Sequence, residues 1–324
     1  MVTRRTFVAG AAALASASGA PFVFAQGTPK ELTFAVIPVE NASLTTDRFG
    51  PLAKYLTDAV GIPVTLRIAN DYAAVIEAQR AGNAQIAFYG PASYARAVMT
   101  GVKTEPLVNQ RHETGINGYY SVLWVRADSP YKSVQDLKGK TLALVDPNST
   151  SGNNAPRYFL SKKEGINNLD GFFGKVFFAG GHQNALLALA QGTADVAANE
   201  YFSPTDNMPT RLAEKSLLKD ANGKALNPND FRVVFKSDLL PEGPFAVLES
   251  LPAEVRQKIK QALLELPKQD KKVFDGLSGG KDQELVAIDA RAYEPVIGML
   301  QYNDASYCFL RCASLYWSMP MTGS

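Results

Sequence analysis

The 324-residue chain has few of the residues that build metal, redox or disulfide-stapled sites. It contains two cysteines, two histidines and two tryptophans, and no Cys-x-x-Cys pair. Transition-metal sites usually draw several Cys, His or carboxylate ligands from closely spaced positions, so the sequence gives little support for one. No apolar stretch is long enough for a stable membrane span either, because the longest one is short and rich in Ala, Gly and Ser.

Neither sign of charge is in excess. Lys and Arg number 33 against 31 Asp and Glu, which gives a formal net charge of +2. A nucleic-acid or membrane-surface partner usually requires a basic excess, so the balance argues against both. Hydrophobic residues at 46% and charged residues at 20% are typical of a globular protein, and this length favours two domains.

The N-terminus carries the pattern of an export signal. Thr3-Arg4-Arg5-Thr6-Phe7 is a twin-arginine motif, and the apolar stretch 8–20 and Val23-Phe24-Ala25 follow it. This order predicts a twin-arginine signal peptide over residues 1–25, cleaved before Gln26, and a soluble periplasmic protein. Cleavage removes two arginines and no acid, so the mature chain has a net charge of zero.

The C-terminal tail, residues 306–324, holds both cysteines. Cys308 and Cys312 would be able to pair in an oxidising compartment, although two cysteines four residues apart on one helix strain a disulfide. Paired and unpaired states both stay open. The tail is rich in aromatic residues but has no charge pattern that indicates a partner.

Strands and helices alternate along the mature chain. The first unit places strands at 32–37, 64–68 and 84–88 with helices between them, which predicts parallel pairing in an α/β sheet. A second unit repeats this order after a break at Ala127-Asp128-Ser129-Pro130, and the Pro/Gly-rich segment near residue 240 returns the chain to the first unit. The predicted lobes are 30–126 with 240–305, and 127–239.

The sequence Asp146–Leu160 joins a strand at 141–145 to a helix that we expect to begin near Gly152 or Asn153. The first N–H groups of a helix have no partner within it and lie at the positive end of its dipole, so they attract an anion. Three neighbouring hydroxyls, those of Ser149, Thr150 and Ser151, add neutral donors. The alternative is that these residues only cap the helix.

Four motifs give the chain a resemblance to a known family. They occur in order at Asn70–Tyr94 (NDYAAVIEAQRAGNAQIAFYGPASY), Gly118–Val125 (GYYSVLWV), Asp146–Gly152 (DPNSTSG) and Gly181–Ala197 (GHQNALLALAQGTADVA). Together they resemble the PhnD-like phosphate, phosphite and phosphonate-binding proteins of ABC transporters, over about Leu32 to Leu266. The resemblance implies a type II periplasmic binding protein, with two hinged α/β domains around a central cleft.

The resemblance also implies site residues. Tyr72 and Tyr119 match the two tyrosines that donate to the ligand in this family, and His182 matches its histidine. The loop hydroxyls match Ser149, Thr150 and Ser151. Since histidine is the one side chain here that changes charge near neutral pH, we expect affinity for a dianion to weaken as pH rises.

Two positions depart from the family pattern. Members that bind 2-aminoethylphosphonate hold its ammonium with two carboxylates, and the matching positions here are Phe202 and Gly243. Glu200, Asp206 and Glu242 lie nearby and would be able to substitute for the missing acids. We take Glu200 and Asp206 as candidate ligand residues. If none of the three acids reaches the cleft, the expected ligand is smaller and lacks an amine, such as phosphite or methylphosphonate.

The sequence therefore predicts a binding protein that captures a small phosphonate and delivers it to an ABC permease. It would act as a monomer in the periplasm, without cofactor, metal or nucleic acid. A hydrolase stays open as an alternative because sequence order cannot exclude a Ser-His pair in space. A binding protein for another small anion is a further alternative.

Overall fold

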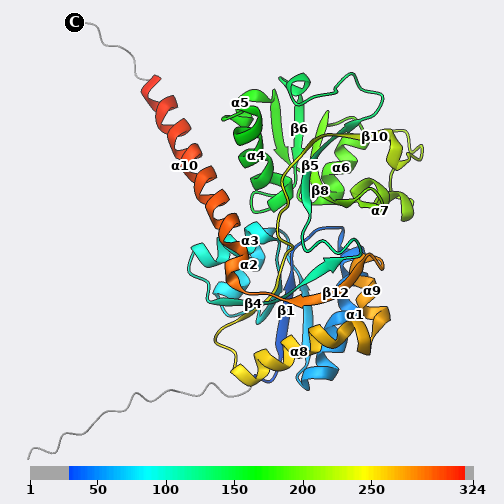
Figure 1. The fold of residues 1–324 in the computed structure, drawn as a ribbon, viewed down its shortest axis with the longest axis vertical. Helices are drawn as coiled ribbons and strands as arrows, with labels where there is room; N and C mark the ends of the chain where they lie inside the picture. The colour runs from blue at the N-terminus through cyan, green and yellow to red at the C-terminus, as the bar shows by residue number, and fades with distance from the viewer. Residues whose placement is uncertain (1–28, 318–324) are drawn as a thin grey trace, which may run out of the picture.

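The computed structural model describes residues 29–317, with side chains described as far as residue 306. The chain forms two α/β lobes, one above the other in Figure 1. The predicted signal peptide, residues 1–25, lies outside the described residues, as do residues 318–324 of the predicted tail. Among the helices of residues 29–317, none has the length and apolar character that a membrane span requires.

The first lobe, at the bottom of Figure 1, is built on a six-stranded sheet. Its spatial order is β12-β4-β11-β3-β1-β2. β1 lies between β2 and β3 and pairs with both in parallel, as the strand-helix alternation predicted, and the other pairs are antiparallel. The strands are β1 (Leu32–Val36), β2 (Val64–Ile68), β3 (Ile86–Phe88), β4 (Thr104–His112), β11 (Phe245–Leu248) and β12 (Asp282–Ala287).

Aromatic rings join this sheet to its helices. Phe34 of β1 packs edge-on against Phe49 with ring centroids 5.9 Å apart, and Phe88 lies 4.9 Å from Phe245. All four rings are buried, and each burial of this kind contributes about 1.5–3 kcal/mol. The helices of this lobe are α1 (Ala42–Val60), α2 (Tyr72–Arg80), α3 (Pro91–Met99), α8 (Ala253–Gln269) and α9 (Lys271–Ser278).

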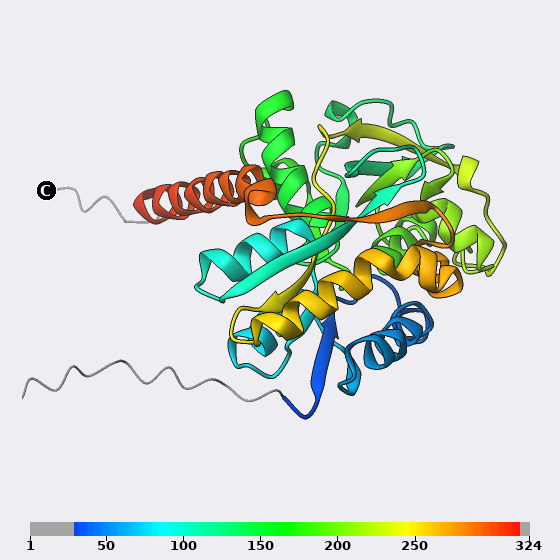
Figure 2. The ribbon, with the colours of Figure 1, turned by 60° about the horizontal axis from the view of Figure 1, so that its bottom comes forward.

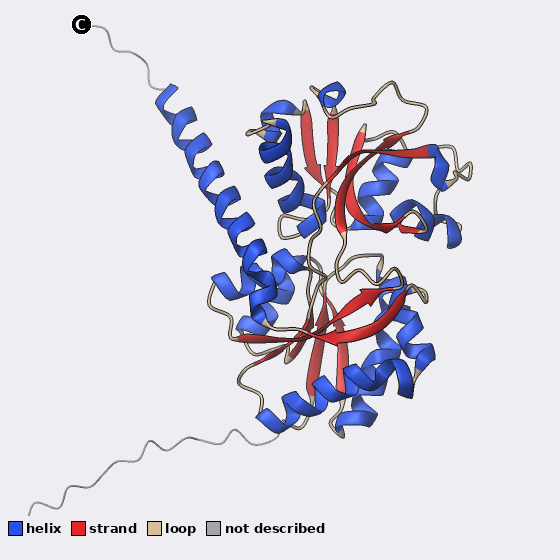
Figure 3. Cartoon of the chain, in the orientation of Figure 1, coloured by secondary structure: helices blue, strands red, loops and turns tan. Residues whose placement is uncertain are grey.

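The second lobe has the same kind of α/β arrangement as the first. Its sheet has the order β10-β5-β8-β6-β7, with β6 parallel to β7 and β8. Figure 3 shows the strands of each lobe in the centre with helices on both sides. The strands are β5 (Tyr120–Arg126), β6 (Thr141–Leu144), β7 (Lys175–Phe178), β8 (Val196–Ser203), β9 (Asp206–Asn207) and β10 (Phe231–Lys236). The helices are α4 (Ala155–Glu164), α5 (Leu169–Phe172), α6 (His182–Ala190) and α7 (Met208–Glu214).

The first lobe boundary needs a correction. The sequence analysis ended the first lobe at residue 126, but β5 pairs with β8 and β10 of the second sheet. The crossing therefore lies in residues 113–119, before β5. A strand's own sequence does not specify which sheet it joins, because the partner strands lie more than 70 residues away.

The two crossings, residues 113–119 and 237–244, touch one another. Tyr119 and Leu240 exchange backbone hydrogen bonds of 3.0 and 2.8 Å. Next to this pair, a Cβ on Gly118 would lie 2.3 Å from the carbonyl oxygen of Leu240. Only glycine allows the two segments to approach so closely.

The last helix contacts both lobes. α10 runs over Glu294–Trp317, so it extends into the predicted tail and through positions 308 and 312. Figures 1 and 2 both show it beside α4. Its Asp304 pairs with Arg96 of α3 at 2.7 Å, and its Tyr302 hydroxyl lies 2.7 Å from the Ser161 hydroxyl of α4. The part of α10 that precedes the predicted tail thus contacts both lobes and braces them.

Candidate ligand-binding site

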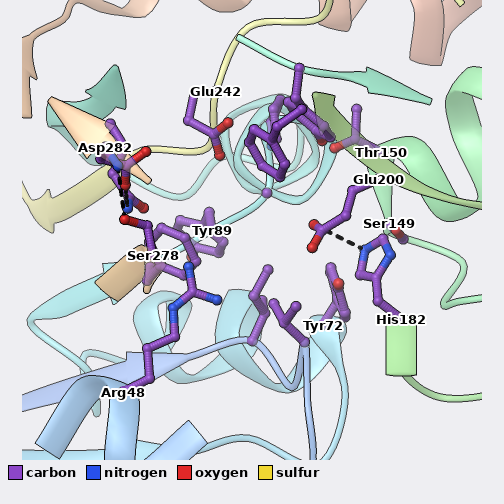
Figure 4. Close-up of a pocket in the computed structure, with 18 of the residues that line it drawn as sticks. Arg48, Tyr72, Tyr89, Ser149, Thr150, His182, Glu200, Glu242, Ser278 and Asp282 are labelled. Atoms are coloured by element: carbon purple, nitrogen blue, oxygen red, sulfur yellow. Dashed lines mark hydrogen bonds and ion pairs between the residues drawn. The ribbon is translucent and has the colours of Figure 1, made fainter. Parts of the chain in front are cut away.

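A pocket lies between the two lobes and is lined by residues of both. Figure 4 shows it enclosed by side chains from the strand ends and helix starts of each lobe. Its cavity volume of about 50 Å³ has room for roughly four water molecules. This size suits a ligand of few atoms.

Four helices begin at this pocket. α2 begins at Tyr72, α3 at Pro91 and α6 at His182, and a π-helical turn that leads into α4 begins at Thr150. All four of these residues line the cavity. Each helix start carries the positive end of a dipole, so their convergence favours an anion, even though the N–H groups of Tyr72 and His182 already donate within the protein.

The predicted loop caps a helical turn and also lies at the pocket. The Ser149 hydroxyl caps the turn by accepting from the Gly152 N–H at 3.1 Å, and Ser149 also lines the cavity. The turn covers Thr150–Asn154, so the helical segment begins slightly earlier than expected. A Cβ on Gly152 would lie 2.2 Å from Val145 Cγ2, so glycine is required here by packing against the preceding strand.

Thr150 connects the lobes as well as lining the pocket. Its hydroxyl accepts from the Ala92 N–H of α3 at 2.8 Å. Ser151 lies deeper and does not line the cavity. Its carbonyl accepts from Ser121 Oγ at 2.7 Å, while its own buried hydroxyl lacks a partner of normal geometry within residues 29–306.

Both predicted tyrosines lie at the pocket with almost no exposure, at 1% for Tyr72 and 5% for Tyr119. The Tyr72 hydroxyl lies near the Ser149 side chain and the Tyr119 hydroxyl near those of Thr150 and Ser151. Burial, reinforced by nearby acids, raises the pKa of each tyrosine well above its ordinary value. Both therefore stay protonated and act as donors.

His182 is held in one orientation. Its Nδ1 lies 2.8 Å from Asn199 Oδ1, and its backbone N–H donates to the Val39 carbonyl of the first lobe at 3.2 Å. Since an amide oxygen only accepts, Nδ1 carries a hydrogen and Nε2 is left toward the pocket. Figure 4 shows Nε2 facing Glu200, at 3.9 Å.

The two predicted acids share one arginine that the sequence analysis missed. Arg211 of α7 donates to Glu200 at 2.8 Å and to Asp206 at 2.7 Å. Asp206 also lies 3.3 Å from His112 Nε2 of the first lobe. Glu200 lines the cavity but Asp206 does not, so the structure brings only the first of them to the pocket.

Phe202 and Gly243, the two positions that depart from the family pattern, are both closely packed against their neighbours. Phe202 lines the pocket and stacks on the rings of Tyr119 and His112, with centroids 5.4 and 5.8 Å apart. A Cβ on Gly243 would lie 2.1 Å from the carbonyl oxygen of Tyr89. A carboxylate side chain therefore cannot be placed at residue 243 without moving backbone.

Glu242 lies at the pocket in place of such an acid. Its carboxyl oxygen accepts from the Gly243 N–H at 3.0 Å, and it has no basic ion-pair partner in the described part of the chain. Burial raises the pKa of Glu242 to about 8. Most of its population is therefore uncharged at neutral pH.

Glu242→Gln is expected to stabilise the protein increasingly as pH rises. The unfolded chain loses this proton near pH 4.5, whereas the folded chain keeps it to about pH 8. As pH rises from 4.5 to about 8, the wild-type protein thus loses the stability that protonated Glu242 contributes, by up to about 1.4 kcal/mol per pH unit. Urea unfolding of both proteins at pH 4.5, 6 and 8 measures the difference. Exposed Glu249→Gln controls for the lost charge, and a constant difference would refute the assignment.

A Gly-x-Ser-x-Gly sequence at Gly276–Gly280 also escaped the sequence analysis. In an α/β-hydrolase this motif turns a strand into a helix and presents the serine. Here it ends α9, and Ser278 Oγ accepts from the N–H groups of Lys281 and Asp282 at 3.2 and 3.1 Å. The geometry is that of a helix end. In the described residues, no group of three or more His, Cys, Asp or Glu side chains is placed to hold a metal ion.

The fold and pocket define a two-lobe binding protein of the periplasmic type, and comparisons identify its family. The family described as ABC transporter, phosphonate, periplasmic substrate-binding protein matches residues 34–293. The chain belongs to this family, which confirms the resemblance inferred from its motifs.

Individual relatives support this family assignment. The phosphate-import protein PhnD of Mycolicibacterium smegmatis is 34% identical over 242 residues, which are 73% of this chain and 72% of that protein. The phosphonates-binding periplasmic protein of Escherichia coli is 31% identical over 239 residues, 72% of this chain and 66% of that protein. A binding-protein component of an ABC phosphonate transporter from Pseudomonas aeruginosa superposes with a TM-score of 0.72 at 24% identity, covering 85% of this chain and 87% of that one.

Proposed function

We propose that this protein captures a small phosphonate in the periplasm by closure of its two lobes and delivers it to the permease of an ABC importer. The observation that carries the proposal is the convergence of four helix starts on one buried pocket that also holds two tyrosines, two loop hydroxyls and a histidine. Tyr72, Tyr119, Ser149, Thr150 and His182 are its proposed oxyanion ligands. Hydrogen bonds to a charged group contribute about 1.5–3 kcal/mol each, so such a set supports tight binding.

Closure is supported by bonds that cross the cleft. The Tyr72 N–H of the first lobe donates to Asp146 of the second at 3.3 Å, and Lys215 pairs with Glu40 at 3.2 Å. These contacts form only where the lobes meet, beside the proposed ligand. A ligand that bonds to both lobes would favour this arrangement. Closure needs no second subunit, so we propose a monomer.

The state of the acids near the pocket argues against an amine on the ligand as the main determinant of binding. Arg211 already occupies the carboxylates of Glu200 and Asp206 with hydrogen bonds, and Glu242 is largely uncharged. An ammonium group would have to compete with a guanidinium that makes charge-assisted bonds to two carboxylates. We therefore propose a phosphonate whose binding does not depend on an amine, and Ser151 and Asp206 as supporting residues behind the ligand-binding surface.

A hydrolase is less well supported. His182 bonds to Asn199 and faces Glu200, so it is not paired with a serine hydroxyl in the described residues. Incubation with methylphosphonate and phosphate esters is expected to release no product. Measurable turnover would replace the transport proposal by an enzymatic one.

Calorimetric titration of the mature protein tests the proposal. Methylphosphonate, 2-aminoethylphosphonate, phosphite and phosphate would be compared at pH 7, with sulfate and nitrate as controls. Methylphosphonate is expected to bind at least as tightly as 2-aminoethylphosphonate and more tightly than sulfate. Strong preference for the aminated ligand would overturn the inference about the acids, and binding of none of the four phosphorus oxyanions would overturn the phosphonate assignment.

A further inference from the structure

Arg48 of α1 lines the pocket without an ionic partner. It makes no hydrogen bond or ion pair within residues 29–306, and its Nε atom is buried without an acceptor. Its guanidinium lies over the rings of Phe49 and Phe88, at 5.0 and 5.9 Å from their centroids. A buried donor without an acceptor is unfavourable, and more so when it is charged, so this position favours a bound anion.

The contrast with Arg211 is direct. Arg211 meets two carboxylates at hydrogen-bond distance, whereas Arg48 meets none although both side chains line the same pocket. One guanidinium therefore serves the protein's own structure. The Arg48 guanidinium instead has donors that are available to a ligand bound in the cavity.

Three acids lie near Arg48, and none pairs with it at hydrogen-bond distance. Although burial opposes the effect, the charges of Arg48 and Lys215 lower the pKa of Glu40, and the ionised Glu40 carboxylate pairs with Lys215 at 3.2 Å. Burial raises the pKa of Glu242 to about 8 and also raises that of Asp282. Asp282 is already bonded to the side chain of Gln110. A protonated Glu242 is a donor, so this end of the pocket offers a guanidinium and a carboxylic O–H together.

Figure 4 shows the Arg48 side chain extending into the pocket, across from Thr150. The proposed oxyanion ligands and Arg48 thus lie on different walls of one cavity. A ligand that meets both needs a second anionic group on the side away from phosphorus.

We infer that Arg48 binds a carboxylate on the organic substituent of the ligand, so that the cargo is a small phosphonocarboxylate. This inference rests on the proposed function, which supplies the phosphonate at the opposite wall. A planar guanidinium matches a carboxylate with two parallel hydrogen bonds, and a carboxylate is smaller than a second phosphonate.

The test compares pairs of ligands that differ only in the carboxylate. Phosphonoacetate and 3-phosphonopropionate are titrated against ethylphosphonate and propylphosphonate, with wild type, Arg48→Gln and Arg67→Gln. Arg67 is an exposed residue of β2 and controls for the lost positive charge. Wild type and Arg67→Gln are expected to bind at least one phosphonocarboxylate about 10-fold or more tighter than its partner. Arg48→Gln is expected to abolish that advantage and to change alkylphosphonate affinity by less than about 3-fold.

Each other outcome has a definite meaning. If alkylphosphonates bind wild type and neither phosphonocarboxylate binds better, the inference fails and the proposed function stands. If Arg48→Gln weakens both kinds of ligand equally, Arg48 acts only through its long-range charge, and the inference fails again. If wild type binds none of the four ligands, the proposed function fails and this inference fails with it.

Discussion

Thr150→Val is expected to lower affinity for methylphosphonate by about 100-fold or more. Valine keeps the shape of threonine but loses the hydroxyl that lines the pocket and accepts from the Ala92 N–H across the cleft at 2.8 Å. The ligand would lose a charge-assisted bond, and a buried N–H of the opposite lobe would lose its acceptor. Both losses weaken the closed, liganded state. Calorimetric titration at pH 7 measures the change.

Thr46→Val is the matched control for this substitution. Thr46 is exposed on α1, and its hydroxyl bonds only to the Ala42 carbonyl of its own helix at 2.8 Å. This variant should bind the ligand as wild type does. An affinity of Thr150→Val within about 3-fold of wild type would show that the hydroxyl contributes neither to the ligand nor to closure.

Gly152→Ala is expected to damage both folding and binding. The added Cβ would lie 2.2 Å from Val145 Cγ2 and 2.8 Å from Ser149 Oγ, so either the strand end or the turn must move. Overpacking of this kind costs about 1–3 kcal/mol, or roughly 2–6 °C in Tm for a protein of this size. Because the displaced turn carries Ser149 and Thr150, affinity for methylphosphonate should fall about 100-fold as well.

The control for this variant is Gly276→Ala. Gly276 lies in α9, where an added Cβ meets no atom within 4 Å, so alanine is tolerated there and should leave Tm and affinity close to the wild-type values. If Gly152→Ala matched this control in both measurements, the turn would be free to move and would not fix the ligand-binding geometry.

The loop at the pocket was predictable because its signals are local. A strand, a cluster of hydroxyl residues and a helical pattern follow one another within Thr141–Leu160, and strand ends and helix starts in α/β proteins meet at one edge. The function of Gly152 was not predictable in the same way. A glycine in such a loop suggests room for a ligand, whereas its neighbour in the structure is Val145 of the preceding strand.

The positions of Arg48 and Arg211 at the pocket were not predictable from the sequence. Arg211 lies 11 residues from Glu200, and in the sequence it is simply a basic residue of a short polar helix. Arg48 likewise looks like an exposed residue near the start of α1. Their positions at the pocket depend on how two lobes meet, which involves segments more than 100 residues apart. Residues 120–126 were wrongly assigned to the first lobe for the same reason, since strand pairing is decided by distant partners.

A crystal structure of the mature protein with methylphosphonate would test the central claim most directly. The account predicts that the phosphonate oxygens lie within about 3 Å of the side chains of Tyr72, Tyr119, Ser149, Thr150 and His182, with the lobes closed over them. An anion bound to Arg48 or Arg211 instead, with the loop hydroxyls and both tyrosines left unbound, would contradict it.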